Sequence, residues 1–144
     1  MKKLFFLILI MSSLQAQSPY ILTGVKYYYP VVEINTDKID VKYKSIIKDM
    51  IIKKSKEFEI NTDNYSSRSL AFLMNYISVG DTIALKLSLM LAEDATRLDT
   101  KEDIFVLSYV NTKIFVVEDI DEELVDNVDD MLEEFFEQYK EDNE

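Results

Sequence analysis

Residues 83–92 read IALKLSLMLA, and this stretch decides which fold class the chain belongs to. Bulky apolar residues occupy every second position, with small, polar or flexible residues between them. The five are Ile83, Leu85, Leu87, Leu89 and Leu91. Successive side chains of a strand point to opposite faces, whereas a helix would scatter these five around its axis. The alternation therefore predicts a β-strand with one buried face.

The stretch just before it, residues 68–79 (RSLAFLMNYISV), fits two structures. Its apolar residues suit a helix that ends at Gly80, because glycine is common just past the last helical turn. They also suit a strand joined to the next one by Gly80 and Asp81, a two-residue connection typical of β-hairpins. Since the stretch that follows is a strand, we favour the hairpin.

Three further stretches are rich in β-branched and aromatic residues and predict strands. Residues 20–34 form the first, which should lie at a sheet edge because Pro30 has no amide to donate. Residues 104–110 (IFVLSYV) form the second, and their continuous apolar run predicts burial on both faces. Residues 114–117 follow, so residues 111–112 are either a turn or a kink within one long strand.

Two stretches have apolar residues at helical spacing. Residues 41–57 combine an apolar stripe with a lysine-rich opposite side, which is typical of an amphipathic helix. An acidic helix over about residues 120–140 carries a broader stripe: Leu124, Val125, Val128, Met131, Leu132, Phe135, Phe136 and Tyr139. Asp119 should cap its start, with Glu122 completing a capping box. Residues 141–144 are acidic at the end where the helix dipole favours bases, so we expect the last turn to fray.

These elements predict an α+β fold. The architecture is a two-layer sandwich in which two amphipathic helices pack on a mostly antiparallel sheet of four or five strands. The element order is strand, helix, three or four strands, helix. Placing both helices on one face is the simplest way to bury both stripes. Residues 17–144 are long enough for one domain with a real core.

Residues 1–16 have the order of a cleaved secretory signal peptide. Lys2 and Lys3 precede the apolar run 4–11 (LFFLILIM), and small or polar residues then lead to Ala16. The run is shorter than the roughly 20 apolar residues that span a bilayer. We therefore expect cleavage after Ala16 and a periplasmic or secreted bacterial protein without a membrane span. The chain has no cysteine, which predicts neither a lipid anchor nor a disulfide.

The charge is concentrated at one end of the chain. Residues 17–117 contain 13 basic and 13 acidic residues, whereas residues 118–144 contain 14 acids and one base, Lys140. The formal net charge of −11 becomes −13 when Lys2 and Lys3 are removed, and all of it lies in residues 118–144. Such a chain has no electrostatic reason to bind nucleic acid, and an anionic membrane surface would repel its acidic end.

The residue types of most catalytic centres are missing. The chain has neither histidine nor cysteine, which removes the commonest general base, the thiolate nucleophile and the usual zinc ligands. Gly24 and Gly80 stand alone, so no phosphate-binding loop is present. Glu93 and Asp94 are adjacent on a predicted strand and face opposite sides. Residues 119–130 lack the glycine and glutamate of an EF-hand calcium loop. We expect no cofactor, no metal and no catalytic centre.

A partner surface is predicted where aromatic and basic residues are exposed. Tyr28 should point opposite to Tyr27 and Tyr29, so at least one of the three belongs to the core. The predicted partner surface consists of Tyr27, Tyr29, Lys44 and Lys48. The first strand could also accept a partner strand at its edge, although Pro30 weakens that edge. The basic side of helix 41–57 could pair with the acidic C-terminal helix, within one molecule or between two.

These features favour a noncatalytic exported protein that binds a protein partner in the cell envelope and assists assembly or transport. The element order is similar to that of small envelope auxiliary proteins of lipopolysaccharide assembly and ABC transport, a likeness of order alone. Many of those proteins are lipoproteins, and this chain has no cysteine to lipidate. Two alternatives stay open: a carboxylate-based hydrolase of cell-wall or extracellular polymer, and a soluble carrier of a ligand or ion.

Overall fold

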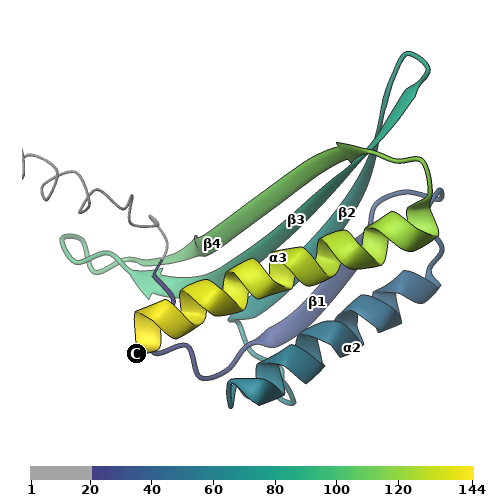
Figure 1. The fold of residues 1–144 in the computed structure, drawn as a ribbon. Coiled ribbons are helices and arrows are strands. Elements are labelled where there is room, and N and C mark those ends of the chain that lie inside the picture. The colour runs from purple at the N-terminus through teal and green to yellow at the C-terminus, as the bar shows by residue number, and fades with distance from the viewer. Residues whose placement is uncertain (1–20) are drawn as a thin grey trace, which may run out of the picture.

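The computed structural model describes residues 21–144, which form a layer of helices on one face of a β-sheet (Figure 1). The predicted signal peptide lies outside the described residues. The elements are β1 (Tyr29–Ile34), α2 (Lys42–Glu57), β2 (Ser69–Val79), β3 (Thr82–Thr96), β4 (Asp103–Val116) and α3 (Ile120–Asn143). The predicted α+β class and element order are confirmed, with three strands between the helices.

Within residues 21–144 the sheet has four strands in the order β1-β2-β3-β4. β1 pairs in parallel with β2, while the β2–β3 and β3–β4 pairings are antiparallel. The sheet is therefore mixed but mostly antiparallel. α2 supplies the crossover that a parallel β1–β2 pair requires. α2 and α3 lie side by side on the same face, as Figure 1 shows.

β2 and β3 form the hairpin that the sequence favours. Val79 pairs with Thr82, so Gly80 and Asp81 make the two-residue connection. Gly80 has a φ of 61°, a left-handed conformation that glycine adopts without steric cost. Residues 69–79 are thus a strand and not a helix.

β1 is shorter than the predicted strand 20–34. It begins only at Tyr29, and before it Tyr27 makes one isolated bridge to Asn61. The chain before β1 is held by burial instead, since Leu22 and Val25 both lie in the core. The predicted edge position of this strand is confirmed, because β1 is the first strand of the sheet.

β4 continues through residues 111–112, so the single long strand is the correct alternative. Its pairing with β3 shifts once. Leu91 pairs with Tyr109 and Ala92 with Leu107, which leaves Ser108 as the extra residue of a β-bulge. The shift turns Tyr109 toward the helices and Leu107 away from them.

The prediction that residues 104–110 are buried on both faces is wrong. Phe105 and Leu107 are 64% and 51% exposed, whereas Tyr109 is buried. Both helices lie on the face that Tyr109 joins, so nothing among residues 21–144 covers the side on which Phe105 and Leu107 lie.

The core lies between the leucines of β3 and the stripes of the two helices. Leu85, Leu87, Leu89 and Leu91 are all fully buried. The buried residues of α3 are Leu124, Val128, Met131, Leu132, Phe135, Phe136 and Tyr139. α2 contributes Tyr43, Ile47, Ile51 and Ser55. The predicted stripe of α3 is confirmed apart from Val125, which is only partly buried.

Asp119 caps the start of α3 as predicted, but the residue that completes the capping box is a neighbour of the predicted Glu122. The Asp119 carboxylate accepts hydrogen bonds from the amides of Asp121 and Glu122, as an N-cap residue should. Glu123, and not Glu122, reaches back to the amides of Glu118 and Asp119, at 3.0 and 2.9 Å. Glu122 is exposed, while Glu123 is partly buried beside the entering chain, so only Glu123 is placed to reach these amides.

The last turn of α3 is ordered by contacts that the sequence did not reveal. The Asp142 carboxylate accepts the amide of Leu22 at 2.6 Å, and the side-chain oxygen of Asn143 accepts the amide of Gly24 at 2.8 Å. The prediction of fraying is therefore wrong. The hydrogen bonds to the chain that precedes β1 outweigh the unfavourable dipole at this helix end.

Two buried hydrogen bonds in series link Tyr28, just before β1, to α2. Ser55 donates to the carbonyl of Ile51 at 2.6 Å, which uses its single proton, so Tyr28 donates to the Ser55 oxygen at 2.6 Å. Tyr28 is fully buried, and this burial raises the pKa of its hydroxyl. The prediction that at least one of the three adjacent tyrosines belongs to the core is confirmed.

We predict that Ser55→Ala lowers the free energy of unfolding by about 1–3 kcal/mol, because it leaves the Tyr28 hydroxyl buried without an acceptor. Urea denaturation followed by circular dichroism measures the change. Ser45→Ala is the matched control, since Ser45 is exposed on the same helix. Equal stabilities for the two variants would contradict the prediction.

Candidate functional site

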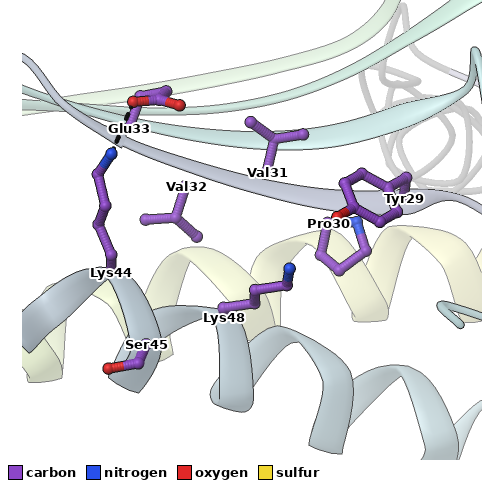
Figure 2. A pocket seen from close by; sticks show the side chains of 8 residues that line it. All are labelled: Tyr29, Pro30, Val31, Val32, Glu33, Lys44, Ser45 and Lys48. Atoms are coloured by element: carbon purple, nitrogen blue, oxygen red, sulfur yellow. Dashed lines mark hydrogen bonds and ion pairs between the residues drawn. The ribbon is translucent and has the colours of Figure 1, made fainter. Parts of the chain in front are cut away.

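A shallow groove of about 330 Å³ runs between β1 and the first half of α2 (Figure 2). It is lined by Tyr29, Pro30, Val31, Val32, Glu33, Lys44, Ser45 and Lys48. Lys44 Nζ lies 2.9 Å from Glu33 Oε2, and Lys48 Nζ lies 5.0 Å from the centre of the Tyr29 ring. Three of the four residues of the predicted partner surface therefore meet here.

The same groove also protects a sheet edge. The amide of Tyr29 donates to the carbonyl of Arg68 at 2.9 Å, so the alternate residues of β1 present their backbone groups to the free edge. Pro30 has no amide to offer there, and Lys44 and Lys48 extend from α2 toward this strand (Figure 2). Proline and lysine are common means of keeping edge strands from pairing with other chains. A partner role for Tyr29, Lys44 and Lys48 stays a prediction.

Tyr27, the fourth predicted residue, does not line the groove. Its ring lies 4.9 Å from the guanidinium of Arg68, whose Nε lies 2.7 Å from Glu93 Oε2. Glu93 is thus neutralised by a salt bridge. Asp94 follows it on β3 and lies on the opposite face of the sheet. These two adjacent carboxylates cannot act together on one substrate.

The basic side of α2 pairs with α3 within one molecule. Lys54 Nζ lies 2.9 Å from a carboxylate oxygen of Asp129 and 3.4 Å from one of Glu133. Lys42 Nζ lies 3.6 Å from Asp121 at the other end of the two helices. Of the two alternatives for these faces, the structure shows the intramolecular one.

The opposite flank of α3 is held by β4. Lys113 Nζ lies 3.5 Å from Asp130 and 3.1 Å from Glu134, and the Asn111 amide group donates to Glu134 at 2.7 Å. Lysines therefore border the acidic helix on both sides. Exposed pairs of this kind each contribute only about 0–1 kcal/mol, but they fix the position of α3 on the sheet.

An open hollow at the starts of the two helices contains a hydrogen-bonded pair whose pKa values are shifted. Tyr43 of α2 donates a short hydrogen bond to the carboxylate of Asp121. This bond raises the pKa of Tyr43 to about 12 and, together with Lys42, lowers the pKa of Asp121 below its ordinary value. The hydrogen bond joins the two helices, and each of the two side chains has its partner in the other.

The described residues contain little that a catalytic centre would use. No three carboxylates among residues 21–144 gather closely enough to hold a metal ion. The acids at the start of α3 are already engaged, because Asp119 and Glu123 cap the helix and Asp121 accepts from Tyr43. In the same part of the chain every buried side-chain oxygen or nitrogen has a hydrogen-bond partner.

Neither helix of the described region has the length and the apolar composition needed to cross a membrane.

An extended apolar surface lies on the side of the sheet opposite the helices, and we call it the open face. The odd-numbered leucines of β3 face the helices, so its even-numbered residues and their partners on the other strands face away. Its apolar members are Val31, Ala71, Leu73, Ile77, Ala84, Met90, Ala92, Phe105, Leu107, Val110, Ile114 and Val116. Phe105, Leu107, Ile114 and Val116 are all more than half exposed.

The open face carries few charges. Its charged residues are Glu33, Lys86, Asp94 and Asp103. Lys86 and Asp94 form no ion pair with any residue in the range 21–144. Ser88 and Thr112 satisfy one another at 3.1 Å. The acidic residues of α3 lie on the other side of the molecule.

The sequence carries a sign of this surface in residues 104–110. The continuous apolar run 104–110 indicates that both sides of β4 are suited to burial. Within one chain only the helix-facing side is buried. The open face is therefore the candidate functional site that the structure adds to the predicted residues.

Comparison of the chain with protein-family models, with curated proteins and with solved structures finds no match.

We predict that the destabilisation caused by Tyr43→Phe depends on pH. The Tyr43 contribution is complete below its ordinary pKa of 10 and is lost as the pH rises through about 12, because folding raises this pKa. The Asp121 contribution is present above its ordinary pKa of 3.8 and is lost as the pH falls through the lower folded value. The difference between wild type and variant should therefore be largest between these limits.

Urea denaturation of both proteins at acidic, neutral and strongly alkaline pH measures this difference. Tyr65→Phe serves as the control, since Tyr65 is exposed and distant in sequence from the pair. A difference that stays constant across the pH range would show that the hydrogen bond to Asp121 contributes nothing.

Proposed function

We propose that this chain is a noncatalytic exported protein that binds a protein partner in the cell envelope through the open face. The observation that carries the proposal is the uncovered apolar side of a sheet whose other side is covered by two helices. Exposure of so many neighbouring apolar side chains to water raises the free energy of the protein unless another surface covers them.

The size of the open face suits protein association. Its strands have 6, 11, 15 and 14 residues. At about 3.3 Å per residue and about 4.8 Å between strands, they give a face of roughly 700 Å². The largest apolar patch on a typical monomer measures about 300–600 Å² and is often functional. The whole open face, polar positions included, is somewhat larger than such a patch, and its apolar members make up about half of its positions.

The composition and geometry support a binding role over a catalytic one. The chain has no histidine or cysteine, Glu93 is neutralised by Arg68, and Asp94 lies on the other face of β3. The grooves beside β1 and between the helix starts are open and shallow, unlike the enclosed sites that bind small molecules. A broad sheet face without an enclosed cavity fits another protein better than a small ligand.

The envelope location in this proposal rests on residues 1–16. Their basic start, apolar run and small residues before Gln17 are the order that export machinery recognises. Assembly or transport in the envelope is a role in which a domain without catalytic residues acts through its contacts.

The test is site-specific photo-cross-linking in the cells that produce the protein. A photoreactive residue at Leu107 or Ile114 should give a discrete cross-linked product, because both positions lie on the open face. The same residue at Leu98 or Ile46 is the matched control, since these exposed apolar positions lie in the β3–β4 turn and on α2. No product from the open face, or equal products from all four positions, would contradict the proposal.

A further inference from the structure

We propose that the partner on the open face is a second copy of this chain, and that two sheets pack face to face in a homodimer. This inference rests on the proposed function and names the occupant of the same surface. Three properties of the described residues point to self-association: where the charge lies, how large the face is, and how its isolated charges are spaced.

The distribution of charge favours contact between two copies through the open face. Most of the net negative charge of residues 17–144 belongs to α3, which lies on the other side of the sheet. Packed sheets lie about 10 Å apart, and a helix adds about 10 Å on each side, so the two α3 helices would be roughly 30 Å apart. Charges at that separation are largely screened, because the Debye length is about 8 Å at physiological salt. Contact through the helix layer would instead bring the acids together.

The area is also what a stable dimer needs. Standard interfaces bury about 800 Å² on each partner, and the open face offers nearly that much. Aligned packing of two sheets over alternating apolar side chains is the arrangement found in β-sandwiches. A second copy would supply the layer whose absence leaves Phe105 and Leu107 exposed, and it would bury both sides of residues 104–110.

The spacing of Lys86 and Asp94 matches a two-fold axis. Both lie on β3 on the open face, and Met90 lies midway between them. We place a two-fold axis midway between the two sheets, perpendicular to the strands and level with Met90. Each strand then stacks on the same strand of the second copy. Lys86 of one chain then lies opposite Asp94 of the second copy. In an isologous interface this pairing occurs twice, and it satisfies both charges of β3 on this face.

The experiment is sedimentation analysis of the purified exported chain from micromolar to millimolar concentration. Wild type should form a dimer. Leu107→Lys should raise the dissociation constant of the dimer about tenfold or more, because it places a lysine within the apolar contact. Leu98→Lys, at an exposed position in the turn, should leave it unchanged. Circular dichroism confirms that both variants are folded.

Charge reversal then tests the two-fold axis. Lys86→Asp and Asp94→Lys should each raise the dissociation constant about tenfold, since each places like charges opposite one another across the interface. The double variant should restore dimerisation. Eight residues along a strand separate the two positions by about 27 Å, so rescue cannot arise within one chain.

Two results would overturn the inference, and a third would exclude the proposed symmetry axis. A chain that stays monomeric at millimolar concentration excludes the second copy, and the proposed function still stands if Leu107 cross-links to another protein. A dimer that Leu107→Lys leaves intact uses another surface, such as the free edge of β4. Two weakened single variants without rescue in the double variant exclude the two-fold axis through Met90.

Discussion

The packing of Phe135 is the contact on which the rest of the structure depends. Its ring meets Tyr109 edge-on at 5.0 Å and Tyr28 at 6.3 Å, and it lies against Phe136 of the same helix. One side chain of α3 thus joins β4, the chain before β1 and the helix layer. Burial of this aromatic cluster places α3 over the middle of the sheet, and the lysines of α2 and β4 then hold it from both sides.

That position determines which side of the sheet remains uncovered. α2 covers one side of the sheet because the parallel strands β1 and β2 need a crossover connection. α3 fills the remaining space on that side, above the leucines of β3. Both apolar stripes are then satisfied on one face. The alternate residues of all four strands in residues 21–144 are left on the other face, where the protein places apolar side chains and few charges. The strong acidity of the chain and its apolar sheet surface are thereby separated by the thickness of the molecule.

Local sequence patterns predicted much of this fold. The alternation in residues 83–92 identified β3, and through it the β2–β3 hairpin, because strand periodicity is visible without knowledge of neighbours. Pro30 correctly placed β1 at an edge. The long-range contacts were not visible. The Asp142 carboxylate accepts the amide of Leu22 across 120 residues of sequence, and Ser55 accepts a hydrogen bond from the Tyr28 hydroxyl. Neither contact produces a periodic pattern in the sequence. For the candidate site, Tyr29, Lys44 and Lys48 share one groove, whereas the outward side of residues 104–110, which the sequence predicts to be buried, is exposed.

The sequence by itself determined the fold class, the order of the elements, the stripes of both helices and the concentration of negative charge in α3. These properties follow from the residues of each segment and their spacing. Only the tertiary structure decided that Lys42 and Lys54 of α2 pair with α3 within one chain, and that Phe105 and Leu107 stay uncovered. An apolar residue indicates only that its burial is favourable. Which surface buries it depends on how distant segments pack, and that surface can belong to another molecule.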